Sequence, residues 1–151
     1  IALSLVGSEM CIRDRESRWL GLRRRLLDSL EDVEHCFVLG TPDESLPNTL
    51  NLGFQGISAE SLLICLDLDG IAVSSGSACS SGAMEASHVL LAMGYSHEQA
   101  KSSLRISMGW NTSEEDIEEL SRKLIHHVKR LTPISGKSDS NIQIPEPVTE
   151  I

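Results

Sequence analysis

Ser103-Leu104-Arg105-Ile106-Ser107-Met108 alternates polar and apolar residues along its whole length. Such alternation predicts a β-strand with one buried face, because successive side chains of a strand point to opposite faces of a sheet. Leu104, Ile106 and Met108 should then face a core. Arg105 should point away from that core, toward a polar space.

Arg105 is therefore a candidate binding residue. Its planar guanidinium can hold a carboxylate through two parallel hydrogen bonds, which is how proteins commonly bind an amino acid or an oxo acid. The alternative is an ordinary surface arginine on an edge strand, and the spacing by itself favours that alternative.

A second informative stretch is Ser74-Ser75-Gly76-Ser77-Ala78-Cys79-Ser80-Ser81-Gly82, in which all the neighbours of a cysteine are small. A cysteine kept for packing usually has large apolar neighbours, whereas glycine and serine favour a solvated, mobile loop. The Cys79 thiol is thus expected to be presented to solvent. The stretch contains no Lys, Arg or His that would lower the pKa of this thiol, so a distant group or the substrate would have to activate it. A plain serine-rich turn is the alternative.

The rest of the pattern predicts one small α/β (α+β) domain. Apolar periodicity and capping residues indicate helices over 17–30, 58–68, 86–93, 96–102 and 112–131, and strands over 35–39, 50–54 and 71–73 besides 103–108. Thr112 and Glu115 have the spacing of a capping box for the last helix. Residues 133–151 are polar and contain prolines, so we expect a disordered tail there.

The composition excludes several functions. A net charge of -9 at pH 7 disfavours binding to nucleic acid, and we interpret the one basic cluster, Arg23-Arg24-Arg25, as a solvated helix face. No apolar run reaches the roughly 18 to 20 residues needed to cross a bilayer. We expect no membrane association and a cytoplasmic protein.

The cysteines and histidines give no sign of a metal site. Neither the four cysteines nor the five histidines have the spacing of metal ligands or of a disulfide framework. Cys36 and Cys65 lie in apolar runs and are expected in the core. His126 and His127 are neighbours on a predicted helix, so they should point to different faces.

The first residues are expected to be foreign to the domain. Residues 4–15 resemble the translation of sequencing-adapter read-through, and the chain begins with Ile1. We therefore predict a non-native or artefactual leader over 1–15, a domain over 16–132 and the tail over 133–151.

With Cys79 and Arg105 both in view, the chain resembles the C-terminal part of a cysteine desulfurase, a pyridoxal-phosphate enzyme of the class V aminotransferase family. The motifs that carry the resemblance occur in order along residues 17 to 131. They are Leu46-Pro47-Asn48-Thr49-Leu50-Asn51, Glu60-Ser61-Leu62-Leu63, Gly70-Ile71-Ala72-Val73-Ser74-Ser75-Gly76-Ser77-Ala78-Cys79, Ser103-Leu104-Arg105-Ile106-Ser107-Met108-Gly109 and Asn111-Thr112-Ser113-Glu114-Glu115.

The resemblance implies both a fold and site residues. The fold would be the small C-terminal domain of a fold-type I enzyme, a short, mostly antiparallel sheet with helices packed on one side. Cys79 would take sulfur from L-cysteine as a persulfide, with release of L-alanine, for iron–sulfur cluster or thio-cofactor synthesis. Arg105 would hold the carboxylate of the substrate. The sulfur would pass to an acceptor such as an iron–sulfur scaffold or a sulfur relay protein.

The same resemblance implies that important parts are missing. The family binds pyridoxal 5'-phosphate mainly through its large N-terminal domain, which this chain lacks, so we expect no cofactor-binding residue here and no catalysis by the chain alone. Family members are usually homodimers. Trp110 stands where they often have a basic residue.

Two alternatives remain open from the sequence. One is a transferase of the selenocysteine lyase type, in which the cysteine loop serves selectivity. The other is a non-enzymatic acidic interaction module in which Cys79 is a redox-sensitive surface thiol.

Overall fold

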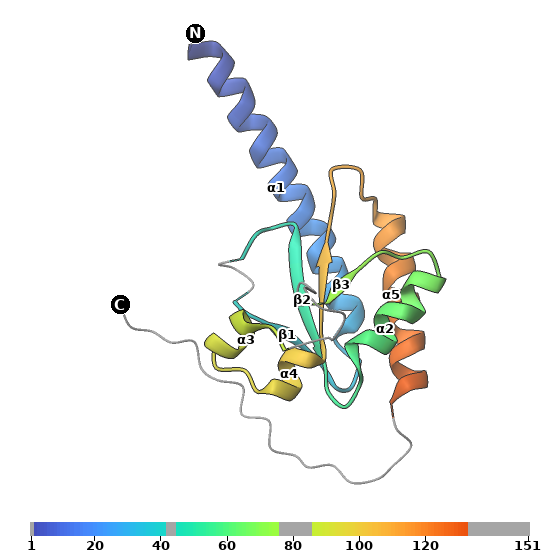
Figure 1. The fold of residues 1–151 in the computed structure, drawn as a ribbon. Coiled ribbons are helices and arrows are strands. Elements are labelled where there is room, and N and C mark those ends of the chain that lie inside the picture. The colour runs from blue at the N-terminus through green and yellow to red at the C-terminus, as the bar shows by residue number, and fades with distance from the viewer. Residues whose placement is uncertain (1, 42–44, 76–85, 133–151) are drawn as a thin grey trace.

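The computed structural model describes residues 2–41, 45–75 and 86–132, with side chains from Ile12 onward (Figure 1). The predicted Cys79 loop and the predicted tail over 133–151 lie outside these residues. The elements are α1 (Ala2–Leu30), β1 (Cys36–Leu39), β2 (Thr49–Phe54), α2 (Ala59–Leu68), β3 (Ser74–Ser75), α3 (His88–Ala92), α4 (His97–Lys101), β4 (Ser103–Ser107) and α5 (Glu114–Leu131).

The strands form one 4-stranded sheet in the order β1-β2-β4-β3, and every neighbouring pair is antiparallel. The helices α1, α2 and α5 cover one face of this sheet, as predicted. The buried residues of that interface are Leu22, Leu26 and Leu30 of α1, Leu50, Leu52 and Phe54 of β2, Leu62 and Leu66 of α2, Leu104 and Ile106 of β4, and Leu120, Leu124 and Val128 of α5.

The short helices α3 and α4 cover part of the opposite face, which corrects the prediction that the helices pack on one side only. Leu39, Leu90 and Ala100 form a second small core there, with Phe37 and Tyr95 packed against it. Phe37 lies directly over Gly53, its partner in the β1–β2 register, and a Cβ atom at Gly53 would overlap the Phe37 ring. Among the described residues, Arg105 and Ser107 of β4 are exposed on this face.

The helix α1 begins at Ala2, well before the predicted start at Ser17. Figure 1 shows its N-terminal part extending beyond the sheet and the other helices, and residues 12–18 are exposed. The spacing of buried apolar residues could not predict the part of α1 before Ser17, because local helix propensity and not packing makes it helical. The interpretation of residues 1–15 as a non-native leader stays a prediction.

The third predicted strand is wrong in its position. It was expected over 71–73, but the ladder is formed by Ser74 and Ser75, opposite Arg105 and Leu104. The Ile71 N–H donates to Leu66 O at 2.8 Å and Gly70, with φ +81, donates to Asp67 O at 2.9 Å. These bonds end α2 as a Schellman-type cap. Gly70 and Ile71 thus belong to the end of the helix, and the β3–β4 ladder begins only after them.

Two smaller predictions also need correction. The capping box of α5 consists of Ser113 and Asp116, one residue later than predicted, because Thr112 Oγ1 accepts a hydrogen bond from Gly109 N at 2.9 Å instead.

Arg23 is only 5% exposed and is not part of a solvated face. Its guanidinium donates to Ser45 Oγ at 2.9 Å and to Leu46 O at 3.4 Å.

Candidate functional site

Arg105 extends from β4 into a pocket on the open face of the sheet. The pocket has a volume of about 390 Å³, and its polar lining includes Asn51, Ser45 and Ser87. Leu90 and Met93 supply an apolar wall. The alternation that predicted the strand is thereby confirmed at Arg105, which is exposed while Leu104 and Ile106 are buried.

The position of Arg105 follows from the register of the sheet. Asn51 of β2 is its direct partner on one side, and Ser74 of β3 is its direct partner on the other. Leu39 of β1 pairs with Asn51. Because paired residues of antiparallel strands point to the same face, a row of side chains crosses the sheet, with Arg105 between two polar residues.

The Arg105 guanidinium is available to a ligand. Within the described residues, no hydrogen bond or ion pair holds it, whereas Arg18, Arg23 and Arg25 each bond to another part of the chain. An arginine with this freedom in a pocket can bind a carboxylate through its fork of N–H groups. The prediction that Arg105 points away from the core is confirmed. The space around it is lined by both polar and apolar residues, and its role in binding stays a prediction.

Cys79, the other predicted site residue, lies outside the described residues. Residues on both sides of its segment are described; one is paired with Arg105 and the other lines the Arg105 pocket. Ser74 pairs with Arg105, and Ser87, which caps α3, lines the pocket. The topology thus attaches the segment that carries Cys79 at both ends to the candidate site.

The loop before β2 supports the same pocket. Asn48 O accepts from Met108 N at 2.8 Å, and Asn48 Nδ2 donates to Met108 O at 3.3 Å. Arg23 holds Ser45 and Leu46 in the same loop. These contacts fix the start of β2, and with it Asn51, relative to the end of β4.

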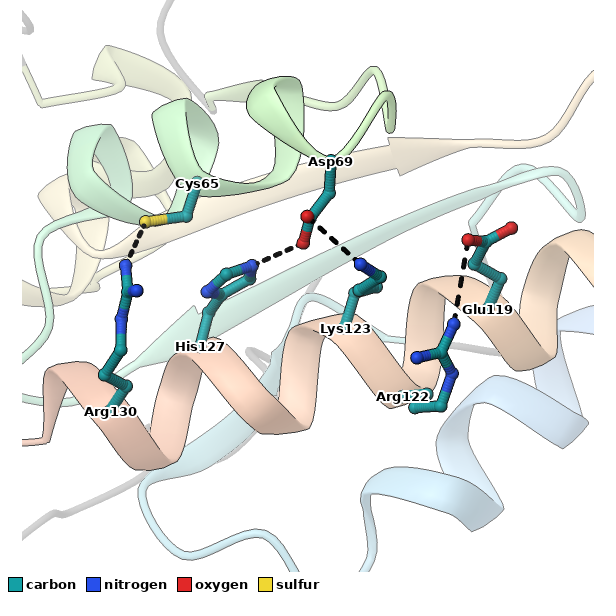
Figure 2. Close-up of polar contacts among 7 residues, drawn as sticks. All are labelled: Cys65, Asp69, Glu119, Arg122, Lys123, His127 and Arg130. Carbon is teal, nitrogen blue, oxygen red and sulfur yellow. Dashed lines mark hydrogen bonds and ion pairs between the residues drawn. The ribbon is translucent and has the colours of Figure 1, made fainter.

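The other described cysteines have different surroundings. Cys36 packs against the main core, and burial raises the pKa of its thiol to about 11, which makes it a poor nucleophile. Cys65 is only half-buried, which corrects the expectation that it lies in the core. Its sulfur accepts a hydrogen bond from Arg130 Nη2 at 3.3 Å (Figure 2).

A polar cluster links the C-terminal end of α2 to α5 (Figure 2). Asp69, the C-cap of α2, accepts from Lys123 Nζ at 3.1 Å and lies 2.7 Å from His127 Nε2. His127 is 6% exposed and His126 is exposed, which confirms that the two side chains point to different faces of α5. No sequence pattern indicates this cluster, because Asp69 lies 54 residues from Lys123 and 58 residues from His127 along the chain.

Asp69 should make the stability of the domain depend on pH. The hydrogen bonds from His127 and Lys123 hold its pKa below the usual value of an aspartate. A carboxyl group with a lowered folded-state pKa stabilises the fold above its unfolded pKa, near 4, and this contribution is lost as the pH falls through the folded pKa. We expect Asp69→Asn to lower the midpoint of urea unfolding at pH 7, with a deficit that shrinks below about pH 4.

The exposed residue Asp67 on the same helix provides the control for that measurement. Asp67→Asn should leave the midpoint close to that of the unchanged chain across the same pH range. An Asp69→Asn deficit that stays constant down to pH 2 would contradict the assignment.

None of the described lysines lies beside Arg105. Lys101 lines a different cavity, beside the start of α2, and Lys123 is paired with Asp69 on the far side of the sheet. Over the described part of the chain, no lysine lines the Arg105 pocket, and no group of His, Cys, Asp or Glu could hold a metal ion. None of the described helices is both long and apolar enough to span a bilayer.

Comparisons with known proteins agree with this arrangement. The family model described as aminotransferase class-V matches residues 2–120. The cysteine desulfurase NifS of Azotobacter vinelandii is 41% identical over 115 residues, which cover 76% of this chain and 29% of that protein. The cysteine desulfurase IscS 1 of Archaeoglobus fulgidus is 39% identical over 114 residues, which cover 76% of this chain and 30% of that protein.

Solved structures show the same fold. A NifS-like protein superposes with a TM-score of 0.68 at 27% identity, over 79% of this chain and 29% of that one. A NifS-like protein from Rickettsia africae gives a TM-score of 0.64 at 30% identity, over 76% of this chain and 29% of that one. The chain thus spans about 30% of the length of these relatives.

Proposed function

Since the chain belongs to the class-V aminotransferase family, we propose that it is the part of a cysteine desulfurase that binds the substrate carboxylate and carries the sulfur. In the whole enzyme, sulfur would move from L-cysteine to Cys79, and L-alanine would be released. The relatives named cysteine desulfurase, at 39% and 41% identity, support this assignment.

One observation in particular supports the proposal. The segment that carries Cys79 begins at the strand partner of Arg105 and ends at a residue that lines the Arg105 pocket. A carboxylate-binding arginine and a sulfur-accepting thiol must serve the same small substrate, so they need to belong to one site. The non-enzymatic alternative would not require an arginine without a protein partner at that place.

In this proposal Arg105 binds the carboxylate of L-cysteine and fixes its orientation, which is a positioning effect. The Cys79 thiolate attacks the sulfur atom of the substrate. A sulfur–sulfur bond forms as the carbon–sulfur bond breaks, the electron pair of the broken bond stays on the carbon, and a proton added there completes L-alanine. The persulfide on Cys79 then passes its outer sulfur to a thiol of an acceptor protein.

The cofactor of the proposed enzyme is pyridoxal 5'-phosphate, which supplies an electron sink when bound. Because the described lysines are remote from the Arg105 pocket, we propose that residues outside this chain hold it. The chain by itself should then show no pyridoxal absorbance and release no sulfide from L-cysteine.

The test uses the whole enzyme and L-cysteine. We expect L-alanine to form and mass spectrometry to find one additional sulfur atom on the peptide that contains Cys79. Alanine formation with the sulfur on Cys36 or Cys65 instead would contradict the assignment of Cys79, and the absence of alanine would contradict the function. With L-cysteine that carries a sulfur label, transfer of the label to a scaffold or relay protein would identify the acceptor.

A further inference from the structure

Asn51 is the polar residue most closely tied to Arg105. The two residues are direct partners in the β2–β4 register and line the same pocket. Side chains at directly opposed positions of antiparallel strands have Cβ atoms about 4.5 to 5.5 Å apart and share a face of the sheet. Both side chains can therefore reach one small ligand in the pocket.

Three of the other polar residues near Arg105 are already engaged. Ser74 Oγ donates to Ser75 O at 3.1 Å, and Ser45 Oγ accepts from Arg23 at 2.9 Å. The Ser87 hydroxyl accepts from Leu90 N at 3.5 Å and caps α3. The Asn51 amide, in contrast, donates to no described residue, and its backbone is fixed on both sides by β1 and β4.

A carboxylate needs more hydrogen bonds than Arg105 alone can give. An ionised carboxylate has about four lone-pair sites, and a bidentate guanidinium occupies two of them. Asn51 offers two amide N–H donors without adding a charge, so it can fill a third site and keep the net positive charge of Arg105 for the ligand. An aspartate at the same place would oppose the ligand and pair with Arg105.

We propose that Asn51 is a second substrate-binding residue, whose side-chain N–H donates to the carboxylate that Arg105 holds. This inference rests on the proposed function. Two strands would then form the carboxylate site: β4 supplies the positive charge of Arg105, and β2 supplies the third hydrogen bond from Asn51.

The first test measures KM and kcat of the whole enzyme for L-cysteine. Loss of a hydrogen bond to a charged group should raise KM about tenfold or more in Asn51→Ala, and the new negative charge should raise it further in Asn51→Asp. We expect kcat to change less than about twofold if the bond acts equally on bound substrate and transition state. Asn111→Ala, at an exposed asparagine outside the pocket, is the matched control and should keep both constants.

The second test needs no turnover. In the 151-residue chain, titration with L-alanine, the carboxylate-bearing product, should shift the NMR signals of the Asn51 side-chain amide and of Arg105 Nε–H together. In Asn51→Ala the Arg105 signal should respond only at higher L-alanine concentrations, with an unchanged thermal unfolding midpoint.

The outcomes separate the two levels of the proposal. Active enzyme with an unchanged KM in Asn51→Ala, or an Arg105 titration that the substitution leaves unaltered, would overturn the role of Asn51 while the desulfurase function stands. An enzyme that makes no alanine but a chain whose Asn51 and Arg105 signals titrate together would overturn the function and keep the carboxylate site. A lower unfolding midpoint without a change in KM would show that Asn51 is structural.

Discussion

Cys79→Ser in the whole enzyme is expected to abolish sulfur transfer, with a fall of about a thousandfold or more in alanine formation. A serine hydroxyl is far less nucleophilic toward sulfur than a thiolate and cannot form a persulfide. Because the sequence predicts that the Cys79 thiol is presented to solvent, we expect the unfolding midpoint to be unchanged. Alanine, sulfide and the mass of the Cys79 peptide are the quantities to measure.

Cys65→Ser is the matched control for that substitution. Cys65 is half-buried on α2, on the other side of the sheet from the Arg105 pocket, and contacts Arg130. Its replacement should leave alanine formation and the persulfide on Cys79 intact. If Cys65→Ser removed activity and Cys79→Ser did not, the sulfur carrier would have to be assigned to α2.

Most of the elements around the core could be predicted from the sequence because each has a local signal. The alternation of apolar Leu104 and Ile106 with polar residues predicted β4. Ser58 at the start of an apolar-periodic run predicted α2. These signals depend on which residues are buried. They fail at Ser103, which alternation assigns to the polar face, yet which is 1% exposed and donates to Ala100 O at 2.8 Å.

The features that escaped prediction depend on partners distant in the chain. The burial of Arg23 requires the loop at Ser45 and Leu46, and the Asp69–His127 contact requires that α2 and α5 lie side by side. A sequence pattern carries no information on either packing choice. At the candidate site, Arg105 could be predicted from its strand alone, whereas Asn51 became evident only through the register between β2 and β4.

The charge and the shape of the Arg105 side chain should contribute separately to binding of L-cysteine. Arg105→Gln removes the charge, and truncation of one partner of a hydrogen-bonded ion pair typically costs about 2 to 5 kcal/mol, so we expect kcat/KM to fall by about a hundredfold or more. Arg105→Lys keeps the charge but loses the bidentate fork, and its kcat/KM should lie between those of Arg105→Gln and the unchanged enzyme. Arg122→Gln, at an exposed arginine of α5, should have no effect. Equal losses in the Lys and Gln variants would mean that the fork geometry matters and the charge does not, whereas full activity in Arg105→Gln would place the substrate carboxylate elsewhere.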